Sequence, residues 1–536
     1  MEWKKKDLTL PPSPLVPDYE RDLLDPFLFK GMDKAVERIL TALTNKEKII
    51  IFGDYDADGV PATALLASFF NQIGFTFYDI FIPDRHLESY GLSLERVKEF
   101  AADDVKLIIT VDCGITDIAE VDLANKQGID VIITDHHLPP AVRPAAEVII
   151  NAKQADDRYP FKELCGSGVA FKLVQALITR GNFNLPKGWE KWLLDLVAVA
   201  TISDMVPLTG ENRVLTHFGL IVLRKTKRVG LKALLAALKL NPRFVTEDDI
   251  GFMVGPRINS ASRMGHASEA YNLLMTEDVE TAATIAKNLD TKNTARKGAV
   301  ENILKAVEGL VGTKEPLPVL VVGQNDFSPG ILGLVASRLV EKYRRPAFVW
   351  GKTEFGEIKG SGRSDGSVNL VELMRAAGDN LFSDLGGHVM AAGFTLLPGK
   401  EGELNDKLNA VYNQVKQATM SSVIFYDREL TLDGCTEATW RVIEQWAPFG
   451  VGNTKPVFLF NKLKVFQVKM FGNGGIHLEL TFKTNQSKNI CAIGFFYTKD
   501  LKVTAGETID LLATMEKSYF RGIPELRLRI VDLKKA

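Results

Sequence analysis

Three short hydrophobic runs, each ending in side chains that can bind a metal, constrain the fold of this chain more than any other feature. The runs cover residues 48–52, 106–111 and 130–134, and a segment of helical composition follows each of them. Hydrophobic runs that alternate with helices in this way predict neighbouring parallel strands in an α/β sheet. Because ligands bind at the carboxyl ends of such strands, we expect the side chains after the three runs to meet at one edge of the sheet.

The side chains that follow the runs are carboxylates and imidazoles: Asp54, Asp56 and Asp58 after the first run, Asp112 after the second, and Asp135, His136 and His137 after the third. Carboxylates so close together repel one another and need a cation between them. These ligands suit Mn²⁺ or Mg²⁺ and tolerate Zn²⁺ or Fe²⁺, whereas a calcium loop would need a preceding helix and a bidentate Glu. A solvated turn or a structural His pair explains each segment alone, but the recurrence at three strand ends favours a metal site.

The length of the chain, 536 residues, is too great for one hydrophobic core, and about three domains are expected. Residues 1–35 are Pro-rich and charged and predict an extended N-terminal arm. Strands alternate with helices over residues 36–278, a helix-forming stretch without proline covers 279–315, and a second α/β unit covers 316–420. Short alternating runs separated by Gly and Asn turns over residues 423–536 predict a small β-barrel of the OB-fold type.

The apolar segments and the cysteines bear on the compartment. No apolar run approaches the ~20 residues that a membrane span needs, and the N-terminal Met1–Lys6 segment is not followed by a signal-like hydrophobic stretch. The four cysteines are widely scattered without a CxxC spacing, which fits a reducing environment and not a zinc knuckle. We therefore expect a cytoplasmic protein with no membrane contact.

Positive charge is concentrated at the C-terminal end. Residues 461–536 contain ten Lys and three Arg against seven Asp and Glu, a net of +6 in a chain of net −2, so the preceding 460 residues carry −8. A basic terminal domain predicts phosphate binding, with a solvated charged surface as the equal alternative. Because single-strand binding combines cations with aromatic rings, the best candidates there are Lys517, Tyr519 and Arg521, although each aromatic alone is more often a core residue.

Six motifs occur in an order typical of one known family: residues 54–59, 111–114, 135–137, 200–208, 255–264 and 386–393. The Asp-rich segment and Asp135-His136-His137 resemble the DHH phosphoesterase superfamily. The later motifs, with residues 447–450 leading into the barrel, resemble its RecJ branch of single-stranded-DNA-specific exonucleases from about residue 20 to the C-terminus. The resemblance implies an α/β fold: a parallel-sheet DHH domain, joined by a long helix to a smaller α/β DHHA1 domain, with a C-terminal OB-like β-barrel.

The resemblance also implies a two-metal phosphodiesterase that binds two Mn²⁺ or Mg²⁺ ions. Asp56 would hold one ion and Asp58 the other, Asp112 would bridge both, and the second site would be completed by His136 and Asp204. His137 would contact a phosphate or support the ligands. Relatives in other branches have a His four positions before the first Asp of the pair. This chain has Phe52 there, which makes Asp54 the nearest substitute ligand.

For the substrate, the resemblance places a terminal-phosphate pocket at Ser361, Arg363 and Arg85. Arg257, Asn259 and Arg263 would lie on the substrate side of the metal site, where the two arginines could neutralise the scissile phosphate, and His388 would approach the strand. Taken alone, the stretch around Arg363 is better explained as a glycine-rich turn with a surface Arg, and for His388 a structural histidine is the competing interpretation.

The function that follows is 5′→3′ hydrolysis of single-stranded DNA to 5′-mononucleotides in DNA repair and recombination, with a helicase or a single-strand-binding protein as candidate partners. One alternative is an oligoribonuclease or cyclic-dinucleotide phosphodiesterase of the same superfamily, which would generally lack the barrel. The other is a non-catalytic replication scaffold of the Cdc45 type, in which the ligand set would have decayed.

Overall fold

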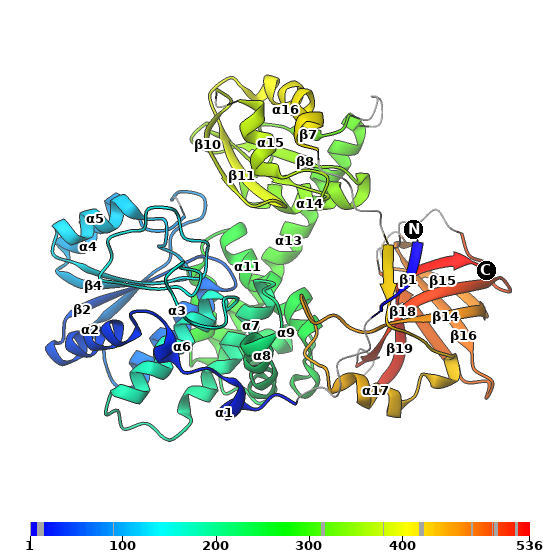
Figure 1. Cartoon of the computed structure of the whole chain (residues 1–536), viewed down its shortest axis with the longest axis horizontal. Coiled ribbons are helices and arrows are strands. Elements are labelled where there is room, and N and C mark those ends of the chain that lie inside the picture. Colours follow the sequence, from blue (N-terminus) through cyan, green and yellow to red (C-terminus); the bar gives the residue numbers. More distant parts are fainter. Residues whose placement is uncertain are drawn as a thin grey trace.

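The computed structural model describes residues 2–7, 16–88, 90–311, 317–378, 380–416, 423–472, 475–495, 497, 502–519 and 524–536. We refer to residues 16–311 as the first unit, residues 317–416 as the second unit and residues 423–536 as the barrel. The second unit lies above the first in Figure 1, joined to it by the helix α13, and the barrel lies to one side. Among the helices described, none has the length and apolarity that a membrane span requires.

The first unit is built on a five-stranded parallel sheet with the order β3-β2-β4-β5-β6. Its strands are β2 (Lys48–Gly53), β3 (Tyr78–Phe81), β4 (Val105–Val111), β5 (Asp130–Thr134) and β6 (Val148–Ile150). Alternate side chains of β2 enter different cores, with Ile49 and Ile51 on one face and Ile50 and Phe52 on the other. The three runs that the sequence marks as strands are therefore neighbouring strands buried on both faces.

Helices cover both faces of this sheet (Figure 1). One face packs against α2 (Met32–Asn45), α3 (Gly59–Gln72) and α6 (Gly166–Arg180), and the other against α4 (Leu94–Ala102) and α5 (Ile118–Lys126). A helical layer continues the unit: α7 (Leu194–Ser203), α8 (Gly210–Leu223), α9 (Val229–Ala237), η4 (Ile250–Val254), α11 (Gly255–Arg263) and α12 (Ser268–Met275). The 33-residue helix α13 (Val279–Val311) then leads to the second unit, as the sequence predicts.

The second unit has a five-stranded mixed sheet with the order β10-β11-β9-β8-β7. Its strands are β7 (Leu320–Gly323), β8 (Ala347–Lys352), β9 (Ile358–Arg363), β10 (Phe382–Gly387) and β11 (Ala391–Leu396). Only β7 and β8 run parallel. The sheet lies between two cores, formed with α14 (Leu332–Tyr343) on one face and with α15 (Leu370–Ala377) and α16 (Glu401–Val415) on the other.

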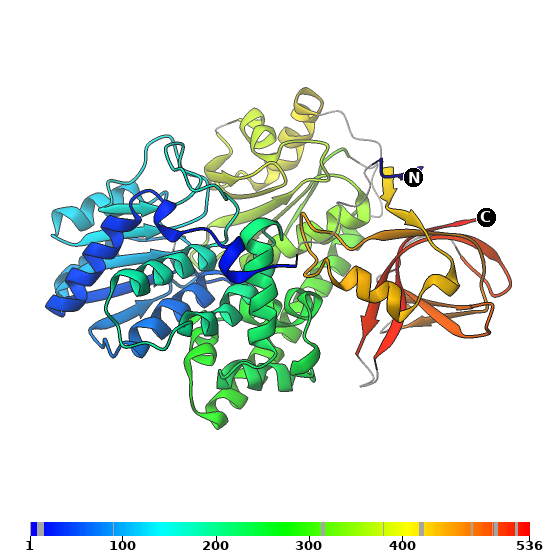
Figure 2. The ribbon, with the colours of Figure 1, turned by 60° about the horizontal axis from the view of Figure 1, so that its bottom comes forward.

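The barrel is a seven-stranded sheet that curls around one hydrophobic core (Figure 2). Its strands are β13 (Arg428–Glu429), β14 (Val457–Lys464), β15 (Gln467–Phe471), β16 (His477–Lys483), β17 (Asn489–Gly494), β18 (Thr508–Ser518) and β19 (Glu525–Lys535). The helix α17 (Glu437–Glu444) lies beside it. The fold class predicted from the sequence, two α/β units followed by a β-barrel, is confirmed.

The N-terminal segment makes a contact that the sequence did not indicate. Strand β1 (Glu2–Lys5) pairs in parallel with β12 (Val423–Tyr426), so both chain ends lie at the barrel in Figure 1. Trp3 Nε1 donates to Asp532 at 2.8 Å, and Lys6 Nζ to Asp427 at 2.7 Å. The described part of the predicted arm therefore includes a strand held on the barrel side.

Candidate metal centre

The ends of three neighbouring strands bring the predicted ligands together. The backbone N–H of Asp54 donates to Val111 O at 3.3 Å, and that of Asp112 to Thr134 O at 2.9 Å, so the residues after β2, β4 and β5 lie side by side. Ligand atoms lie within 4.8 Å of one another in three triads. Two of them share no residue, one of Asp54, Asp56 and Asp112 and one of Asp58, His136 and Asp204, and the third, of Asp112, His136 and His137, overlaps both.

Asp112 and His136 join the two triads into one centre. His136 Nε2 lies 3.1 Å from Asp112 Oδ1, 3.7 Å from Asp204 Oδ2 and 3.9 Å from Asp58 Oδ2. Asp112 also belongs to the triad with Asp54 and Asp56, so its carboxylate faces both groups. This geometry matches the bridging position expected for Asp112.

Backbone N–H groups fix the orientation of the aspartates. Asp56 Oδ1 accepts from Asp58 N at 2.7 Å and from Gly59 N at 3.1 Å, at the start of α3. The two Asp58 oxygens accept from Gly166 N at 2.6 Å and Ser167 N at 2.7 Å, where α6 begins. Because the amino end of a helix carries partial positive charge, α6 stabilises the ionised form of Asp58.

A glycine at the start of α6 permits the close approach of Asp112. A Cβ atom at Gly166 would lie 2.5 Å from Asp112 Cβ, closer than any real contact. Asp112 itself has a φ of 64°, which L-residues rarely adopt. The bridging carboxylate is thus held in a strained backbone position against a residue that has no side chain.

Among the residues that the structure describes, several buried ligand atoms make no hydrogen bond. Asp54 Oδ1, Asp112 Oδ1, Asp204 Oδ2 and His136 Nδ1 are all of this kind. A buried polar atom without a partner costs about 1–3 kcal/mol, and more when it is charged. Divalent cations at the two triads would satisfy the carboxylate oxygens, so the residues present fit a two-ion centre.

The charges of the cluster lead to the same conclusion. Burial, followed by repulsion from neighbouring carboxylates, raises the pKa of Asp58 to about 6 and that of Asp204 to about 8, and holds the pKa of Asp112 well above its usual range. Burial lowers the pKa of His136 to about 3, which keeps the imidazole neutral, the form that binds metals.

His137 differs from His136 in its partners. Its Nδ1 lies 2.8 Å from Asp135 Oδ1, and this carboxylate outweighs the effect of burial and raises the pKa of His137 to about 9. The Tyr90 hydroxyl donates to Asp112 O at 2.9 Å and lies 3.3 Å from the same His137 nitrogen. A protonated imidazole is suited to contact a phosphate, the role expected for His137.

Two of the predicted arginines add positive charge on the substrate side. The Arg85 guanidinium lies 4.8 Å from the Tyr55 ring centroid, next to the Asp-rich loop. Arg263 Nη1 donates to Gly330 O of the second unit at 3.0 Å. Burial, with the charges of Arg85 and Arg296, lowers the pKa of Arg263 to about 10.

The predicted terminal-phosphate residues lie together in the second unit. Arg363 Nη1 donates to Ser361 Oγ at 3.0 Å and to Gly362 O at 2.7 Å. A Cβ atom at Gly333 would lie 2.8 Å from Arg363 Nη2, so the guanidinium packs against the first turn of α14. Burial lowers the pKa of Arg363, and within the described residues this side chain forms no ion pair with a carboxylate.

Three other predicted residues have different surroundings. Arg257 donates to Asp290 at 2.9 Å and to Met253 O at 3.1 Å. Asn259 Oδ1 accepts from Ala57 N at 3.1 Å and so supports the Asp-rich loop. His388 lies exposed in the turn between β10 and β11, and its backbone N–H donates to Ala391 O.

The candidates in the barrel have partners of their own. Lys517 Nζ pairs with Glu437 at 2.9 Å, and Arg521 lies outside the described residues. Tyr519 stacks on Phe244 of the first unit, with ring centroids 4.4 Å apart and an angle of 8° between planes. One face of Tyr519 is therefore used in the contact between the barrel and the first unit.

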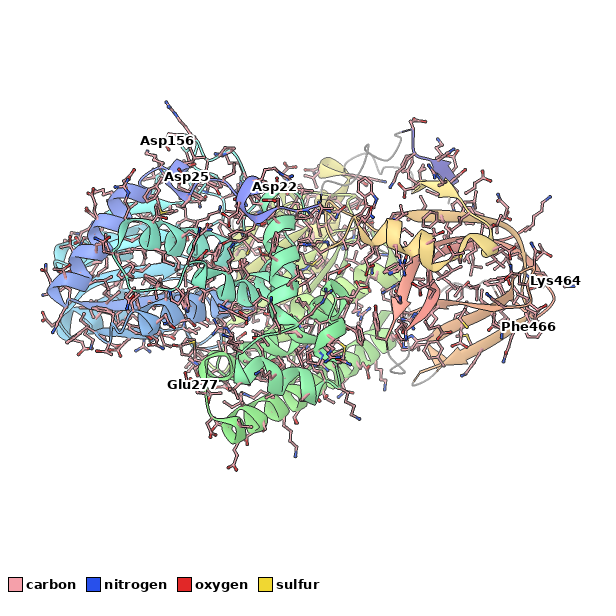
Figure 3. The ribbon with its side chains drawn as sticks, turned by 90° about the horizontal axis from the view of Figure 1, so that it is seen from below. Asp22, Asp25, Asp156, Glu277, Lys464 and Phe466 are labelled. Atoms are coloured by element: carbon pink, nitrogen blue, oxygen red, sulfur yellow. The ribbon has the colours of Figure 1, made fainter. Side chains whose placement is uncertain are left out.

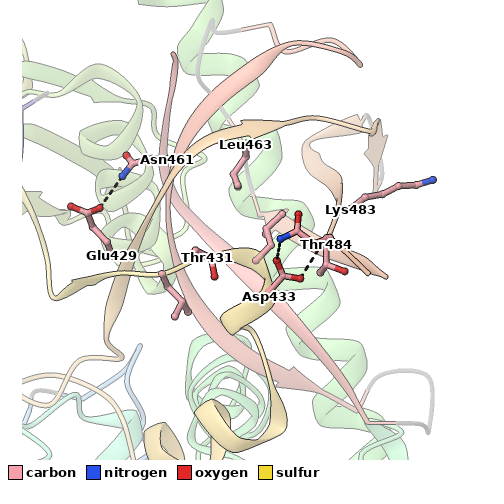
Figure 4. Close-up of a pocket in the computed structure, with 10 residues that line it drawn as sticks. Glu429, Thr431, Asp433, Asn461, Leu463, Lys483 and Thr484 are labelled. Atoms are coloured by element: carbon pink, nitrogen blue, oxygen red, sulfur yellow. Dashed lines mark hydrogen bonds between the residues drawn. The ribbon is translucent and has the colours of Figure 1, made fainter. Parts of the chain in front are cut away.

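A hollow on the barrel offers no competing site. It is lined by Glu429, Asp433, Asn461 and Lys483, among others (Figure 4). Its polar groups largely satisfy one another, since Asn461 donates to Glu429 at 3.1 Å and Asn485 Nδ2 to Asp433 at 2.6 Å. We therefore assign the chemistry to the carboxylate cluster of the first unit.

Comparison with known families and proteins agrees with the fold. The chain matches the DHH family, N-terminal domain, over residues 48–201, the DHHA1 domain over residues 316–414 and the RecJ OB domain over residues 426–532.

Individual relatives cover most of the chain. It is 35% identical to the single-stranded-DNA-specific exonuclease RecJ of Dickeya dadantii, over 84% of this chain and 81% of that protein. Its identity to the RecJ of Bacillus subtilis is 37% over 96% of this chain, which spans 64% of that relative's length, less than two thirds. The crystal structure of Thermus thermophilus RecJ in complex with Mn²⁺ superposes with a TM-score of 0.79 at 29% identity, over 95% of this chain and 72% of that one. On these grounds the chain belongs to the RecJ family.

Proposed function

We propose that this protein is a metal-dependent exonuclease that hydrolyses single-stranded DNA from the 5′ end to 5′-mononucleotides. The observation that carries the proposal is the position of Asp112, which faces both ligand triads at once. The relatives named single-stranded-DNA-specific exonuclease RecJ support the choice of substrate. DNA repair and recombination are the processes in which we place this activity.

The reaction requires charge stabilisation at the scissile phosphate. When bound, two divalent ions at the triads would activate a water and stabilise the charge that builds up on the phosphate. The ligands proposed to hold them are Asp56, Asp58, Asp112, His136 and Asp204, with Asp54 beside Asp56. The substrate-side cations in this proposal are Arg85, Arg263 and the protonated His137, and Arg257 and Asn259 support the surrounding helix and loop.

The polarity of the reaction rests on Arg363. This half-buried guanidinium and Ser361 would bind a terminal phosphate as a fork, because Arg binds phosphate through two parallel hydrogen bonds. The 5′ end would then stop at the pocket, and the next phosphodiester would reach the metal ligands. His388 on the neighbouring turn would contact the same end of the strand.

Single-stranded DNA is the proposed partner of the barrel, with Lys517, Tyr519 and Arg521 among its contacts, and a helicase or single-strand-binding protein is a further proposed partner. The presence of the barrel favours a single-strand exonuclease over an oligoribonuclease or cyclic-dinucleotide phosphodiesterase. The intact set of metal ligands favours the exonuclease over a replication scaffold. A cytoplasmic location also belongs to the proposal, since the four cysteines are scattered along the chain without a CxxC spacing.

One digestion experiment tests the proposal. Single strands labelled at the 5′ or 3′ end are incubated with Mn²⁺, with Mg²⁺ or with chelator. We expect immediate release of a labelled mononucleotide from the 5′-labelled strand only, and only with metal. Early release from the 3′ end, or equal activity in chelator, would overturn it.

A further inference from the structure

We propose that Glu211 is a positioning residue for the metal centre, and that it acts together with a segment near the N-terminus. This segment covers residues 18–30, and we call it the docked arm. The inference rests on the proposed function, because it concerns the same metal centre. It assigns a role to a buried carboxylate that lies outside the ligand triads.

The docked arm packs against the helices of the first unit. It contains the short helix α1 (Tyr19–Asp22), and Figure 3 shows Asp22 and Asp25 of the docked arm on the first unit. Phe29 is buried and stacks on Tyr159, with ring centroids 3.7 Å apart and an angle of 18° between planes. This part of the predicted extended arm is therefore packed into the first unit.

A buried ion pair fastens the docked arm. Lys172 on α6 and Glu211 on α8 are 0% and 2% exposed, and Lys172 Nζ lies 2.5 Å from Glu211 Oε1. The backbone of Leu24 binds both partners, because its N–H donates to Glu211 Oε1 at 2.9 Å and its carbonyl oxygen accepts from Lys172 Nζ at 2.8 Å. The Tyr159 hydroxyl donates to Glu211 Oε2 at 2.5 Å. Since a buried ion pair is stable only with such additional hydrogen bonds, the pair and the docked arm depend on each other.

The next residue on α8 connects this anchor to the metal ligands. Asn212 is fully buried, and its Nδ2 donates to the carbonyl oxygens of Glu163 and Pro207. Pro207 belongs to the loop that follows Asp204, and Glu163 belongs to the segment that leads into α6. The first N–H groups of α6 in turn hold Asp58. A displacement of the start of α8 would therefore move the segments that place Asp58 and Asp204.

The effect of Glu211 should be selective for one ion. Asp58 and Asp204 belong to one triad with His136, and both depend on the segments that Asn212 joins. Asp54 and Asp56 belong to another triad, and their orientation is fixed by hydrogen bonds with β4 and with the start of α3. Loss of the Glu211 anchor should therefore weaken the ion at the triad of Asp58, His136 and Asp204 more than the other ion.

The alternative is that the buried pair stabilises the fold without acting on the metal centre. A second variant that lowers the stability of the same core at a different place separates the two roles. Leu235 on α9 is buried in that core and makes no hydrogen bond through its side chain. Leu235→Ala should lower the Tm through the cavity that it leaves, and should leave the affinity for both ions unchanged.

The test measures Mn²⁺ binding by the full chain with calorimetry, and hydrogen exchange of the metal-free protein in chelator. Both charges are removed together, because a single buried charge without its partner is strongly destabilising. Lys172→Met/Glu211→Gln keeps an oxygen that accepts from the N–H of Leu24, whereas Lys172→Met/Glu211→Met has a side chain of similar length and no such oxygen.

We expect Lys172→Met/Glu211→Met to bind one of two Mn²⁺ ions about 10–100-fold more weakly, the usual effect of groups that orient metal ligands. The other ion should be affected less, and Lys172→Met/Glu211→Gln should bind both ions nearly as the wild type does. In chelator, residues 18–30 and 205–209 should exchange faster in the Met variant than in the Gln variant.

Tyr159→Phe is a milder variant that removes only the hydroxyl bound to Glu211, and it should weaken the same ion by a smaller factor. Wild-type affinity for both ions in the Met double variant would overturn the positioning role, as would an equal loss of the same ion in Leu235→Ala. If the double variant does not fold, wild-type affinity in Tyr159→Phe overturns it instead. The proposed function is judged separately by the end-labelled digestion, because a chain that binds two ions and releases no nucleotide would contradict only that function.

Discussion

The backbone N–H of Leu208 donates a 2.7 Å hydrogen bond to the carbonyl oxygen of Val451, so the loop that follows Asp204 ends on the barrel. The packing there is close, since a Cβ atom at Gly452 would lie 3.1 Å from Pro207 Cβ. The segment of residues 445–455 thus joins the barrel to the first unit at Leu208, which lies four residues after the proposed metal ligand Asp204. We therefore expect docking of the barrel and the geometry of the metal centre to be coupled through this loop.

Arg213→Ala should loosen this docking. Arg213 donates to the carbonyls of Gln445 at 3.1 Å, Trp446 at 3.4 Å and Ala447 at 3.3 Å. Loss of these bonds should cost about 2 kcal/mol of docking free energy. We expect faster amide hydrogen exchange in residues 205–213 and 445–455, and weaker Mn²⁺ binding because Asp204 precedes the same loop. Arg375→Ala, on an exposed face of α15, is the control, and unchanged exchange in both segments would contradict the coupling.

The metal-free protein should lose stability as the pH rises. Asp58 and Asp204 have folded-state pKa values of about 6 and about 8, above the ordinary value near 4 in the unfolded chain. The folded state therefore binds more protons, and its stability falls as the pH rises through these values. Thermal unfolding in chelator should show a lower Tm at about pH 8 than at about pH 6, and Mn²⁺ should remove most of the difference.

Asp112→Asn tests whether the buried carboxylates cause the loss of stability of the metal-free protein at high pH. Removal of one buried negative charge should raise the Tm of the metal-free protein at about pH 8 above that of the wild type, while Mn²⁺ binding and hydrolysis are lost. Asp122→Asn, at an exposed position on α5, should change neither. A Tm at about pH 8 no higher than that of the wild type would show that the charge of Asp112 does not contribute to this loss of stability.

The metal centre could be predicted from the sequence because most of its ligands lie in short segments that can be recognised without knowledge of the rest of the fold. Every ligand except Asp204, which follows the helix α7, lies just after a strand whose hydrophobic run is readable, and parallel strands align their carboxyl ends. The contacts between units were not predictable, because residues such as Leu208 and Val451 are more than 200 positions apart and carry no motif. Tyr519 is an example. We expected it to be a stacking surface for DNA, but the sequence around it does not show that Phe244 covers one face of its ring.

Gly166→Ala should displace the bridging carboxylate without unfolding α6. The added Cβ would meet Asp112, whereas alanine itself suits a helix. Because groups that orient metal ligands typically contribute 10–100-fold in affinity, we expect a loss of that order in Mn²⁺ binding by calorimetry. Gly402→Ala, which would have no atom within 4 Å, is the matched control. Wild-type Mn²⁺ affinity in Gly166→Ala would mean that Asp112 is free to move and does not depend on this close approach.

Arg363→Lys should reduce the preference for 5′-phosphorylated ends. The guanidinium is buried against Gly333 and directed by Ser361, and a lysine ammonium cannot reproduce its two parallel donors. A lost charged hydrogen bond is worth about 1.5–3 kcal/mol, so the ratio of kcat/KM on phosphorylated to unphosphorylated strands should fall at least about tenfold. The rate on unphosphorylated ends should fall less, since these never fill the pocket. Arg375→Lys, in the same unit, should keep the wild-type ratio, and an equal loss on both kinds of end in Arg363→Lys would place the terminal phosphate elsewhere.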